Sequence, residues 1–272
     1  MRQPRAGASP DMQDLFDLSG RNAVITGSTK GIGKAIAEAL AAHGANVVIS
    51  SRKQDVCEAV RDAINESGAA ASRPHGKAVS IPCNISDREA IDQLIDQTHE
   101  QLGQIDILVC NAAVNPFYGS FLDIPASAFE KVMDVNIKSN NWLAQPMAPE
   151  KTERRDGVIQ IVSSIGGLRG STVLGAYSIS KAADMQLVRN LAAELGPSNV
   201  RVNGIAPGLV KTDFARALWE NDQLRQAREA ETPLRRLGEP EDLAGIAVYL
   251  ASRAGAWTTG QTFVVDGGVT SC

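Results

Sequence analysis

The sequence predicts an α/β protein: a single-domain, Rossmann-like doubly wound fold with a seven-stranded parallel sheet and helices on both faces. Short apolar runs rich in Val and Ile alternate along the chain with longer segments whose apolar residues recur at the helical period. Strands that are apolar throughout are typical of parallel sheets covered on both faces. A length of 272 residues allows one domain or two, and the lack of any repeat, composition shift or linker favours one.

The expected elements follow in order from the first strand. NAVIT at 22–26 predicts a buried strand, and the glycines after it lead into a helix at 34–43. ANVVIS at 45–50 predicts the second strand, and 55–67 the second helix, because its apolar residues recur among charges at the helical period. The remaining strands are predicted at 78–83, 105–111, 158–163, 200–205 and 261–265, and the remaining helices at 87–102, 126–144, 176–195 and 239–252.

Three features depart from this alternation. The segment 68–77 contains Gly, Ala and Pro and predicts a loop longer than its neighbours. The polar segment 212–233 predicts a helical excursion, and its place after a strand end makes it a candidate lid. Pro146 and Pro149 predict that the helix in which they lie ends or kinks there, because proline lacks the N–H that a helix needs.

Composition excludes several classes of protein. The 27 basic and 31 acidic residues give a net charge of −4, far from the basic footprint of a nucleic-acid binder. No apolar run approaches the ~18 residues of a membrane span, and 1–17 lacks the apolar core of a signal peptide. We therefore expect a cytoplasmic protein without nucleic-acid or membrane partners, in which 1–17 is a flexible N-terminal arm on a domain spanning 18–272.

The cysteines and histidines predict no metal site. The chain has three histidines and four cysteines, and no two cysteines form a C-x-x-C pair. Such spacings favour idle thiols in a reducing compartment over a zinc site or a redox dithiol. This expectation applies to Cys57, Cys83, Cys110 and Cys272.

A glycine-rich turn between the first strand and the first helix predicts an anion-binding site. Glycines permit a tight turn and let backbone N–H groups approach a phosphate at the positive end of a helix. The spacing is G-x-x-x-G-x-G, which matches a dinucleotide-binding fingerprint in context but not letter for letter, so a plain structural turn stays an alternative. The predicted pyrophosphate contacts are Gly27, Ser28, Thr29, Lys30, Gly31, Ile32 and Gly33.

The residues after the second strand indicate which dinucleotide is bound. In such folds an acidic residue binds the ribose 2′-hydroxyl of NAD(H), whereas a basic residue accommodates the 2′-phosphate of NADP(H). Here Ser51 is followed by Arg52 and Lys53, with no acid. Arg52 can bind a phosphate through two parallel hydrogen bonds and Lys30 can add a second cation, so we predict NADP(H) as the cofactor. The alternative is that Arg52 and Lys53 are solvated surface charges.

Three polar residues form a candidate catalytic group. Tyr177 and Lys181 are four residues apart in a predicted helix, so their side chains share one face, and Ser164 stands at the carboxyl end of the strand 158–163, where open α/β sheets bind ligands. A free tyrosine has a pKa near 10, and lowering it by about 3 units needs about 4 kcal/mol. An ammonium about 4 Å away supplies roughly that amount at an effective dielectric constant of 20. Without Ser164 and the glycine-rich turn, a surface pair would be the better interpretation.

Six short motifs occur in the order and spacing of one known family. They are TGSTKGIG at 26–33, NAA at 111–113, Asn136, Ser164, Tyr177 with Lys181, and APG at 206–208. On these motifs the chain resembles a short-chain dehydrogenase/reductase of the common single-domain kind, over about 18–268. Stretches at 111–116 and 235–242 resemble the branch of NADP-dependent carbonyl and retinal reductases found in peroxisomes, although 270–272 is not a peroxisomal address.

The resemblance implies a role for each matching residue. Tyr177 would be the general acid in carbonyl reduction and the base in alcohol oxidation, and Ser164 would hydrogen-bond the reacting oxygen. Lys181 would tune Tyr177 and hold the nicotinamide ribose, and Asn136 would position a water in a proton relay. A homotetramer is also implied, through the helix that bears Tyr177 and the C-terminal strand. The implied cofactor contacts beyond the turn are Ser51, Arg52, Asn84, Ile85, Asn111, Ala112, Ala113, Tyr177, Lys181, Pro207, Gly208, Val210 and Thr212.

The chain departs from the family pattern at two positions. Ala113 stands where the family usually has glycine, so a methyl group must approach the cofactor. Asn84 stands where an aspartate usually meets the adenine amino group, and its amide oxygen can accept the same hydrogen bond without the charge. Weaker adenine binding, with activity retained, is the expected consequence.

The leading hypothesis is an NADPH-dependent reductase of a ketone or aldehyde that runs in reverse as an alcohol dehydrogenase. A reductase of 3-oxoacyl thioesters, carried on acyl carrier protein or coenzyme A, is the second hypothesis, and a cofactor-sensing scaffold without chemistry is the third. Apolar side chains on loops near the expected site suggest an apolar substrate, although each could equally pack the core or the lid. They are Phe117, Tyr118, Leu168, Val173, Phe214 and Trp219.

Overall fold

The computed structural model describes residues 14–272, and seven parallel strands in it form one sheet in the order β3-β2-β1-β4-β5-β6-β7. All seven predicted strands are present, within a few residues of their expected bounds, and the predicted Rossmann-like doubly wound fold is confirmed. Strand order reverses between β1 and β4, the point at which open α/β sheets form their ligand crevice. The strands are β1 (Asn22–Thr26), β2 (Asn46–Ser50), β3 (Ala78–Ser80), β4 (Ile107–Cys110), β5 (Gly157–Val162), β6 (Val200–Pro207) and β7 (Thr262–Val265).

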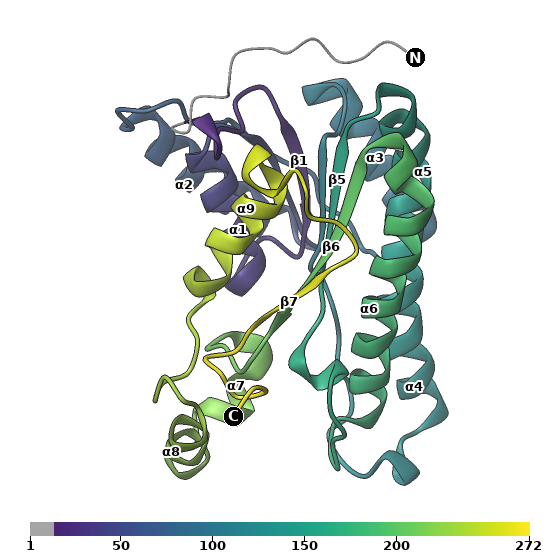
Figure 1. Ribbon diagram of the computed structural model, residues 1–272, viewed down its shortest axis with the longest axis vertical. Helices are drawn as coiled ribbons and strands as arrows, with labels where there is room; N and C mark the ends of the chain where they lie inside the picture. The colour runs from purple at the N-terminus through teal and green to yellow at the C-terminus, as the bar shows by residue number, and fades with distance from the viewer. Residues whose placement is uncertain (1–13) are drawn as a thin grey trace.

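Helices cover both faces of the sheet. In Figure 1, α1, α2 and α9 lie on one side of the strands and α3, α5 and α6 on the other, with α4 beside α6. The helices are α1 (Gly31–Ala42), α2 (Gln54–Ala69), α3 (Arg88–Leu102), α4 (Ala126–Met133), α5 (Ser139–Arg154), α6 (Gly175–Leu195), α7 (Arg216–Trp219), α8 (Asp222–Glu231) and α9 (Ala244–Ala251).

The hydrophobic core is split into two layers by the sheet. Ile36 and Leu40 of α1 belong with Val248 of α9 to the cluster on one face, and Leu94 of α3 and Val188 of α6 belong to the cluster on the other. Successive residues of each strand point to opposite layers, which is why apolar residues occur at consecutive strand positions such as 23–25 and 47–49. The two layers hold the carboxyl ends of the strands in fixed positions for a site.

The helix predicted at 126–144 differs from expectation in two ways. It is interrupted by a π-helical segment, η3 (Asp134–Lys138), and it then runs on as α5 through Pro146 and Pro149. Of the two predicted outcomes at the prolines, an end or a kink, the end is therefore wrong. Each proline removes one backbone hydrogen bond, at a cost of roughly 3 kcal/mol inside a helix. The buried face of α5, which includes Leu143 and Met147, keeps the helix against the sheet and outweighs this cost.

The connector and the candidate lid both take the predicted form. Between α2 and β3 the chain has no helix or strand, as predicted for 68–77. The excursion after β6 contains the short helices α7 and α8, at the end of the molecule where the strands point (Figure 1). Of the predicted arm 1–17, only 14–17 lies within the described residues, and there Asp14 and Leu15 accept hydrogen bonds from Arg253 and Ala254. None of the helices among residues 14–272 has both the length and the apolar character to cross a membrane.

Candidate active site

A cavity of about 1460 Å³ opens at the carboxyl ends of β1, β4, β5 and β6. It is lined by the residues after each of these strands and by the lid segment that follows β6. Every site residue predicted from the sequence lines it, except Ser28 and Asn136. The topology therefore brings segments that are far apart in the chain to one place, at the point where strand order reverses.

The glycine-rich turn leaves donors free at the start of α1. Gly27 and Gly31 adopt left-handed backbone angles, φ 65° and 54°, that glycine tolerates best. No side chain caps α1, and its first turn contains no acidic residue, so its first N–H groups remain available to an anion. A Cβ atom at Gly33 would lie 2.4 Å from the Gly27 carbonyl oxygen and 2.4 Å from Asn111 Nδ2. The turn therefore fits a bound pyrophosphate.

Ser28 braces this turn from inside the protein, contrary to the predicted phosphate contact. Its hydroxyl donates to the Ile25 carbonyl and accepts from the Ser50 N–H, at 2.7 and 2.8 Å. Its own N–H donates to the Ser50 carbonyl. Because the side chain is fully buried and both donors are used, Ser28 links β1 to β2 and fixes the shape of the turn.

Gly33→Ala tests whether this turn binds the cofactor. The added methyl group has no room beside Gly27 and Asn111, so the turn must shift. The first N–H groups of α1 then move away from the positions in which they can bind the cofactor. We expect the dissociation constant for NADPH to rise at least about tenfold, as the loss of one or more charge-assisted hydrogen bonds predicts. Fluorescence titration with NADPH measures it.

Gly245→Ala is the matched control for this prediction. Gly245 lies in α9, and a Cβ atom there meets nothing within 4 Å. Alanine at this position should therefore leave NADPH affinity unchanged and stabilise the helix by about 0.5–1 kcal/mol. Equal affinity in the Gly33→Ala and Gly245→Ala variants would refute the assignment of the turn to the cofactor.

The segment after β2 presents basic side chains to the cavity. Ser51, Arg52 and Lys53 line it, and Arg52 is exposed without a hydrogen-bond or ion-pair partner among residues 14–272. Lys30 is placed differently from the prediction, because its ammonium pairs with Asp213 of the lid at 3.1 Å. Asp213 also binds Arg216, and these contacts, that of Arg216 first, lower the pKa of its carboxyl group. Of the predicted phosphate-binding cations, Arg52 is thus free and Lys30 is engaged by the lid.

The middle of the cavity is formed by the segments after β3 and β4. Asn111 ties β4 to the turn after β1 through its Nδ2, which donates to the carbonyls of Thr26 and Gly27 at 2.9 and 3.2 Å. Asn84 lines the cavity, and its amide oxygen already accepts a hydrogen bond from the Ser86 N–H at 3.2 Å. The other predicted contacts that line this part are Ile85, Ala112 and Ala113.

The segment after β6 offers an unused donor. Val210 is buried and bridges to Gly238, with the hydrogen bonds of that bridge made by Lys211 and Leu209. The Val210 N–H therefore has no acceptor among the described residues and suits an amide ligand such as the predicted nicotinamide carboxamide. Pro207, Gly208 and Thr212 line the same part of the cavity.

Ser164 and Tyr177 converge on one small residue. The Ser164 hydroxyl accepts a hydrogen bond from the Gly166 N–H at 3.0 Å and so begins the short helix η4 (Ile165–Gly167) directly after β5. A Cβ atom on Gly166 would lie 3.4 Å from Ser164 Oγ and 3.8 Å from Tyr177 Cε1. The Tyr177 ring packs against Phe214 of η6 (Asp213–Ala215), with ring centroids 5.8 Å apart. Ser164 and Tyr177 therefore lie close together, as predicted, and Phe214 of the candidate lid lies beside Tyr177.

Lys181 has a partner that the sequence analysis missed. Its ammonium lies 5.8 Å from the Tyr177 ring centroid and donates to the Val162 carbonyl and to Asp184 Oδ2, both at 2.9 Å. Burial is the largest single influence and would lower the pKa of Lys181, but the attraction and hydrogen bond of Asp184, together with attraction to Tyr177 and Cys110, outweigh it, and the pKa is raised. Acidic residues three or four positions from a lysine on a helix are a recognisable signal, and Asp184 follows Lys181 by three.

Asn136 lies behind the cavity and is fully buried. Its side chain donates to the Val114 carbonyl and to Ser180 Oγ, both at 3.0 Å, and accepts from the Val114 N–H. The backbone carbonyl of Asn136 accepts a hydrogen bond from Asn140 Nδ2 at 2.8 Å. Asn136 therefore fixes the segment after β4 against α6, and among the described residues one lone pair on its side-chain oxygen and one on its backbone oxygen are left for the predicted water.

The lid side of the cavity combines apolar and basic side chains. Of the six apolar residues singled out in the sequence, Tyr118, Val173 and Phe214 line it, whereas the other three do not. Arg169 and Arg228 also line it, which the sequence analysis did not foresee. The cavity is therefore less uniformly apolar than predicted.

Comparison with known proteins assigns the chain to a family. A family model described as enoyl-(acyl carrier protein) reductase matches residues 27–270. Dehydrogenase/reductase SDR family member 4 of Bos taurus is 41% identical over 264 residues, which cover 96% of this chain and 91% of the relative. The chain therefore belongs to the short-chain dehydrogenase/reductase family of oxidoreductases.

Solved structures of the family share the whole fold. A 7α-hydroxysteroid dehydrogenase complexed with NADH and 7-oxo glycochenodeoxycholic acid has a TM-score of 0.88 at 38% identity, with 94% of this chain and 96% of that chain covered. A gluconate 5-dehydrogenase from Burkholderia cenocepacia J2315, complexed with NADP and tartrate, has a TM-score of 0.89 at 30% identity, with 95% and 98% covered. Nicotinamide dinucleotides of both kinds thus occur among its structural relatives.

Proposed function

We propose that this protein is an NADP(H)-dependent oxidoreductase that transfers a hydride between NADPH and a ketone or aldehyde, and that in reverse oxidises a secondary or primary alcohol. The observation that supports this most is that Ser164, Tyr177 and Lys181 line the same cavity as the uncapped start of α1. An anion-binding turn and an acid–base group in one cavity suit a dinucleotide cofactor and a carbonyl substrate.

Each side chain has a distinct part in this proposal. NADPH, when bound, supplies the hydride. Tyr177 donates its proton to the carbonyl oxygen during reduction and accepts one from the alcohol during oxidation. Ser164 orients the reacting oxygen by a hydrogen bond, and the ammonium of Lys181 favours the deprotonated form of the phenol by its charge. Asn136 holds the segment after β4 in place from behind the cavity.

The preference for NADP(H) rests on Arg52. Its guanidinium is exposed at the cavity and has no partner among the described residues, and no acidic residue stands beside it to bind a ribose 2′-hydroxyl. A guanidinium matches the geometry of a phosphate and would bind the 2′-phosphate of NADP(H). Because the structural relatives include complexes with NADH and with NADP, the local charge is the stronger argument.

The substrate side favours a carbonyl compound with an apolar part. Tyr118, Val173 and Phe214 line the cavity, Phe214 against the Tyr177 ring, and would bury such a group. A reductase of 3-oxoacyl thioesters on acyl carrier protein or coenzyme A uses the same side chains and stays the alternative. The relative crystallised with an oxo bile acid supports a cyclic ketone as one member of the test set.

A substrate panel separates these candidates. With NADPH as reductant, we expect kcat/KM for apolar free ketones and aldehydes to exceed that for acetoacetyl-CoA by at least about tenfold, because ~1.4 kcal/mol of differential transition-state binding suffices for that ratio. NADPH oxidation is followed by its absorbance. A preference for the thioester would replace the leading candidate by the alternative, and no turnover on any carbonyl would leave the cofactor-sensing scaffold.

The proposal extends to the assembly and surroundings of the protein. We propose a homotetramer formed through α6 and β7, since β7 is the last strand of the sheet and Val264 on it is 40% exposed. A cytoplasmic location without a nucleic-acid or membrane partner is also part of the proposal, and the net charge of −4 argues against the nucleic-acid partner.

A further inference from the structure

A buried carboxylate lies directly behind Lys181. Asp184 is fully buried, and its Oδ2 accepts a hydrogen bond from Lys181 Nζ at 2.9 Å. Its other oxygen, Oδ1, accepts from Asn140 Nδ2 of α5, also at 2.9 Å. Both oxygens of the carboxylate are therefore used, one by a charged donor and one by a neutral donor.

Asn140 connects this pair to the π-helical segment η3. Its Nδ2 also donates to the carbonyl of Asn136, at 2.8 Å, so its amide cannot turn without losing that bond. The amide thereby fixes the orientation of the Asp184 carboxylate. Polar groups buried this deeply are costly unless they are bonded, and here both oxygens of Asp184 and the amide nitrogen of Asn140 have partners.

The pair determines how the ammonium of Lys181 is oriented. An ammonium has three N–H donors, of which one binds Asp184 and one binds the Val162 carbonyl at 2.9 Å. Since Lys181 also lines the cavity, the third donor remains for a group bound there. A lysine held at two points on its protein side presents the third donor in a fixed direction.

Asp184 also decides the charge of Lys181. The other titratable groups that act on Lys181 are Tyr177, one turn earlier on α6, and Cys110 at the end of β4. Burial raises the pKa of the Cys110 thiol, so that group stays neutral. Asp184 is therefore the principal charge that offsets the burial of the ammonium.

We propose that Asp184 is a positioning residue for the reaction: it keeps Lys181 protonated and directs the remaining ammonium donor into the cavity. Asp184 acts through Lys181, because it does not line the cavity itself. The inference rests on the proposed function, in which Lys181 serves Tyr177 and the cofactor. It adds an acid, held by Asn140, to the Ser-Tyr-Lys group.

The test is the pH dependence of two quantities, kcat/KM for alcohol oxidation with NADP⁺ and the affinity for NADPH. A group whose pKa is raised keeps its charge beyond the pH at which it ordinarily titrates, so the unaltered protein should keep both quantities across the whole range in which an ordinary lysine stays protonated. Asp184→Asn removes the counter-charge and leaves the burial. We expect both quantities to fall at a pH at least about one unit lower, and kcat at neutral pH to drop about tenfold. Asp184→Glu, which keeps the charge, should restore the alkaline limit.

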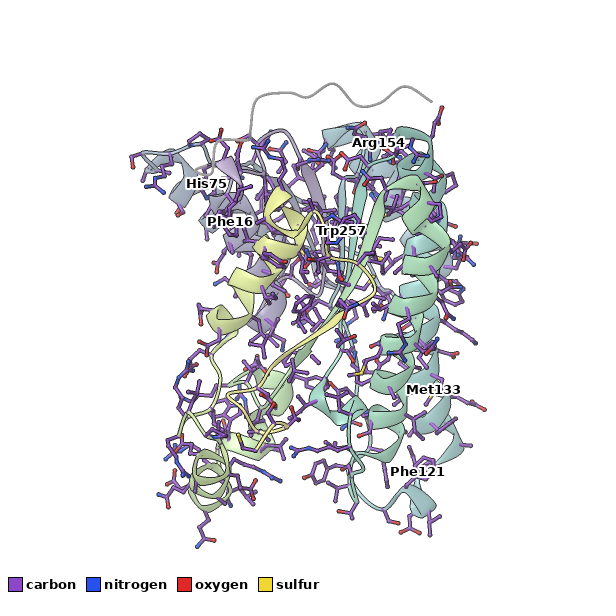
Figure 2. All side chains as sticks on the ribbon, viewed as in Figure 1. Phe16, His75, Phe121, Met133, Arg154 and Trp257 are labelled. Carbon is purple, nitrogen blue, oxygen red and sulfur yellow. The ribbon has the colours of Figure 1, made fainter. Side chains whose placement is uncertain are left out.

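Asp106→Asn is the matched control. Asp106 is also a buried acid, which accepts hydrogen bonds from the Asn22 N–H and from Arg154 at 2.8 and 2.7 Å. Figure 2 shows Arg154 at the end of the molecule opposite to the lid helices that Figure 1 labels. The control variant should therefore lose thermal stability without any change in either pH profile.

The outcomes distinguish this inference from the proposed function. If Asp184→Asn lowers only the melting temperature, as Asp106→Asn does, then Asp184 is structural and the inference is overturned. If the Asp184→Asn variant does not fold, NADPH affinity is measured against pH in the unaltered protein instead. A loss of that affinity below about pH 9, while the protein is still folded, would overturn the inference. Absence of turnover on every carbonyl overturns the proposed function, and the NADPH affinity profile then still reports on Asp184.

Discussion

Replacing Tyr177 by phenylalanine should lower kcat for carbonyl reduction by about 1000-fold, within the range that general acid catalysis contributes, while NADPH still binds. The variant removes one hydroxyl group and keeps the ring, which packs against Phe214 at a centroid distance of 5.8 Å. The fold and the cavity wall are therefore preserved, and the loss concerns the proton donor alone. Stopped-flow or steady-state absorbance of NADPH gives kcat, and fluorescence titration gives the affinity.

Tyr249→Phe provides the matched control. The Tyr249 hydroxyl bonds Thr258 Oγ1 at 2.8 Å, and Tyr249 does not line the cavity. Its removal should change thermal stability by about 1 kcal/mol and leave kcat as it is. Unchanged turnover in the Tyr177→Phe variant would show that another group donates the proton and would withdraw Tyr177 from the proposed site.

A loss of turnover in both tyrosine variants has a different meaning. It would point to a general sensitivity of the fold, since the two hydroxyl groups belong to different helices, α6 and α9. Equal melting temperatures of the Tyr177→Phe variant and the unaltered protein then separate the chemical effect from a structural one. The comparison also bears on the cofactor-sensing scaffold, which predicts NADPH binding without turnover in the unaltered protein and in both variants.

The strands of this protein could be predicted because each contains a short run rich in Val and Ile. The segment at 22–26 can be predicted as a buried strand from its own residues alone, and the observed strand has the same bounds, Asn22–Thr26. The helix at 126–144 was harder, because its continuation through Pro146 and Pro149 depends on burial of α5 against the sheet. Local preference and tertiary packing disagree there, and packing prevails.

The candidate site was predictable where spacing alone decides the geometry. Tyr177 and Lys181 fall on one face of α6 because they are four residues apart. The partner of Lys181 was not predicted although Asp184 has the spacing of a helical ion pair, because most such pairs lie on the surface and only the packing against α5 shows that Asp184 is buried. Ser28 was predicted to contact the phosphate for a similar reason. The sequence does not show that its hydroxyl points into the protein and bonds the backbone of β1 and β2.

The second large effect is expected at Arg52, where Arg52→Asp should reverse the cofactor preference. Breaking one partner of a charged, hydrogen-bonded pair costs about 2–5 kcal/mol, so kcat/KM for NADPH should fall at least about 30-fold. The new carboxylate repels a 2′-phosphate and can accept a hydrogen bond from a ribose 2′-hydroxyl, so kcat/KM for NADH should rise. Steady-state kinetics with both cofactors measures the ratio.

Two further variants decide how this reversal is interpreted. Arg52→Ala removes the cation without adding an acid, and it should lower kcat/KM for NADPH with little change for NADH. Arg189→Ala removes an exposed arginine that bonds Gln186 on the same helix, and it should alter neither value. If the Arg52 variants keep an undiminished preference for NADPH, the 2′-phosphate is bound elsewhere. Lys30 would then be the cation to examine, because the lid residue Asp213 would have to release it for a phosphate to bind.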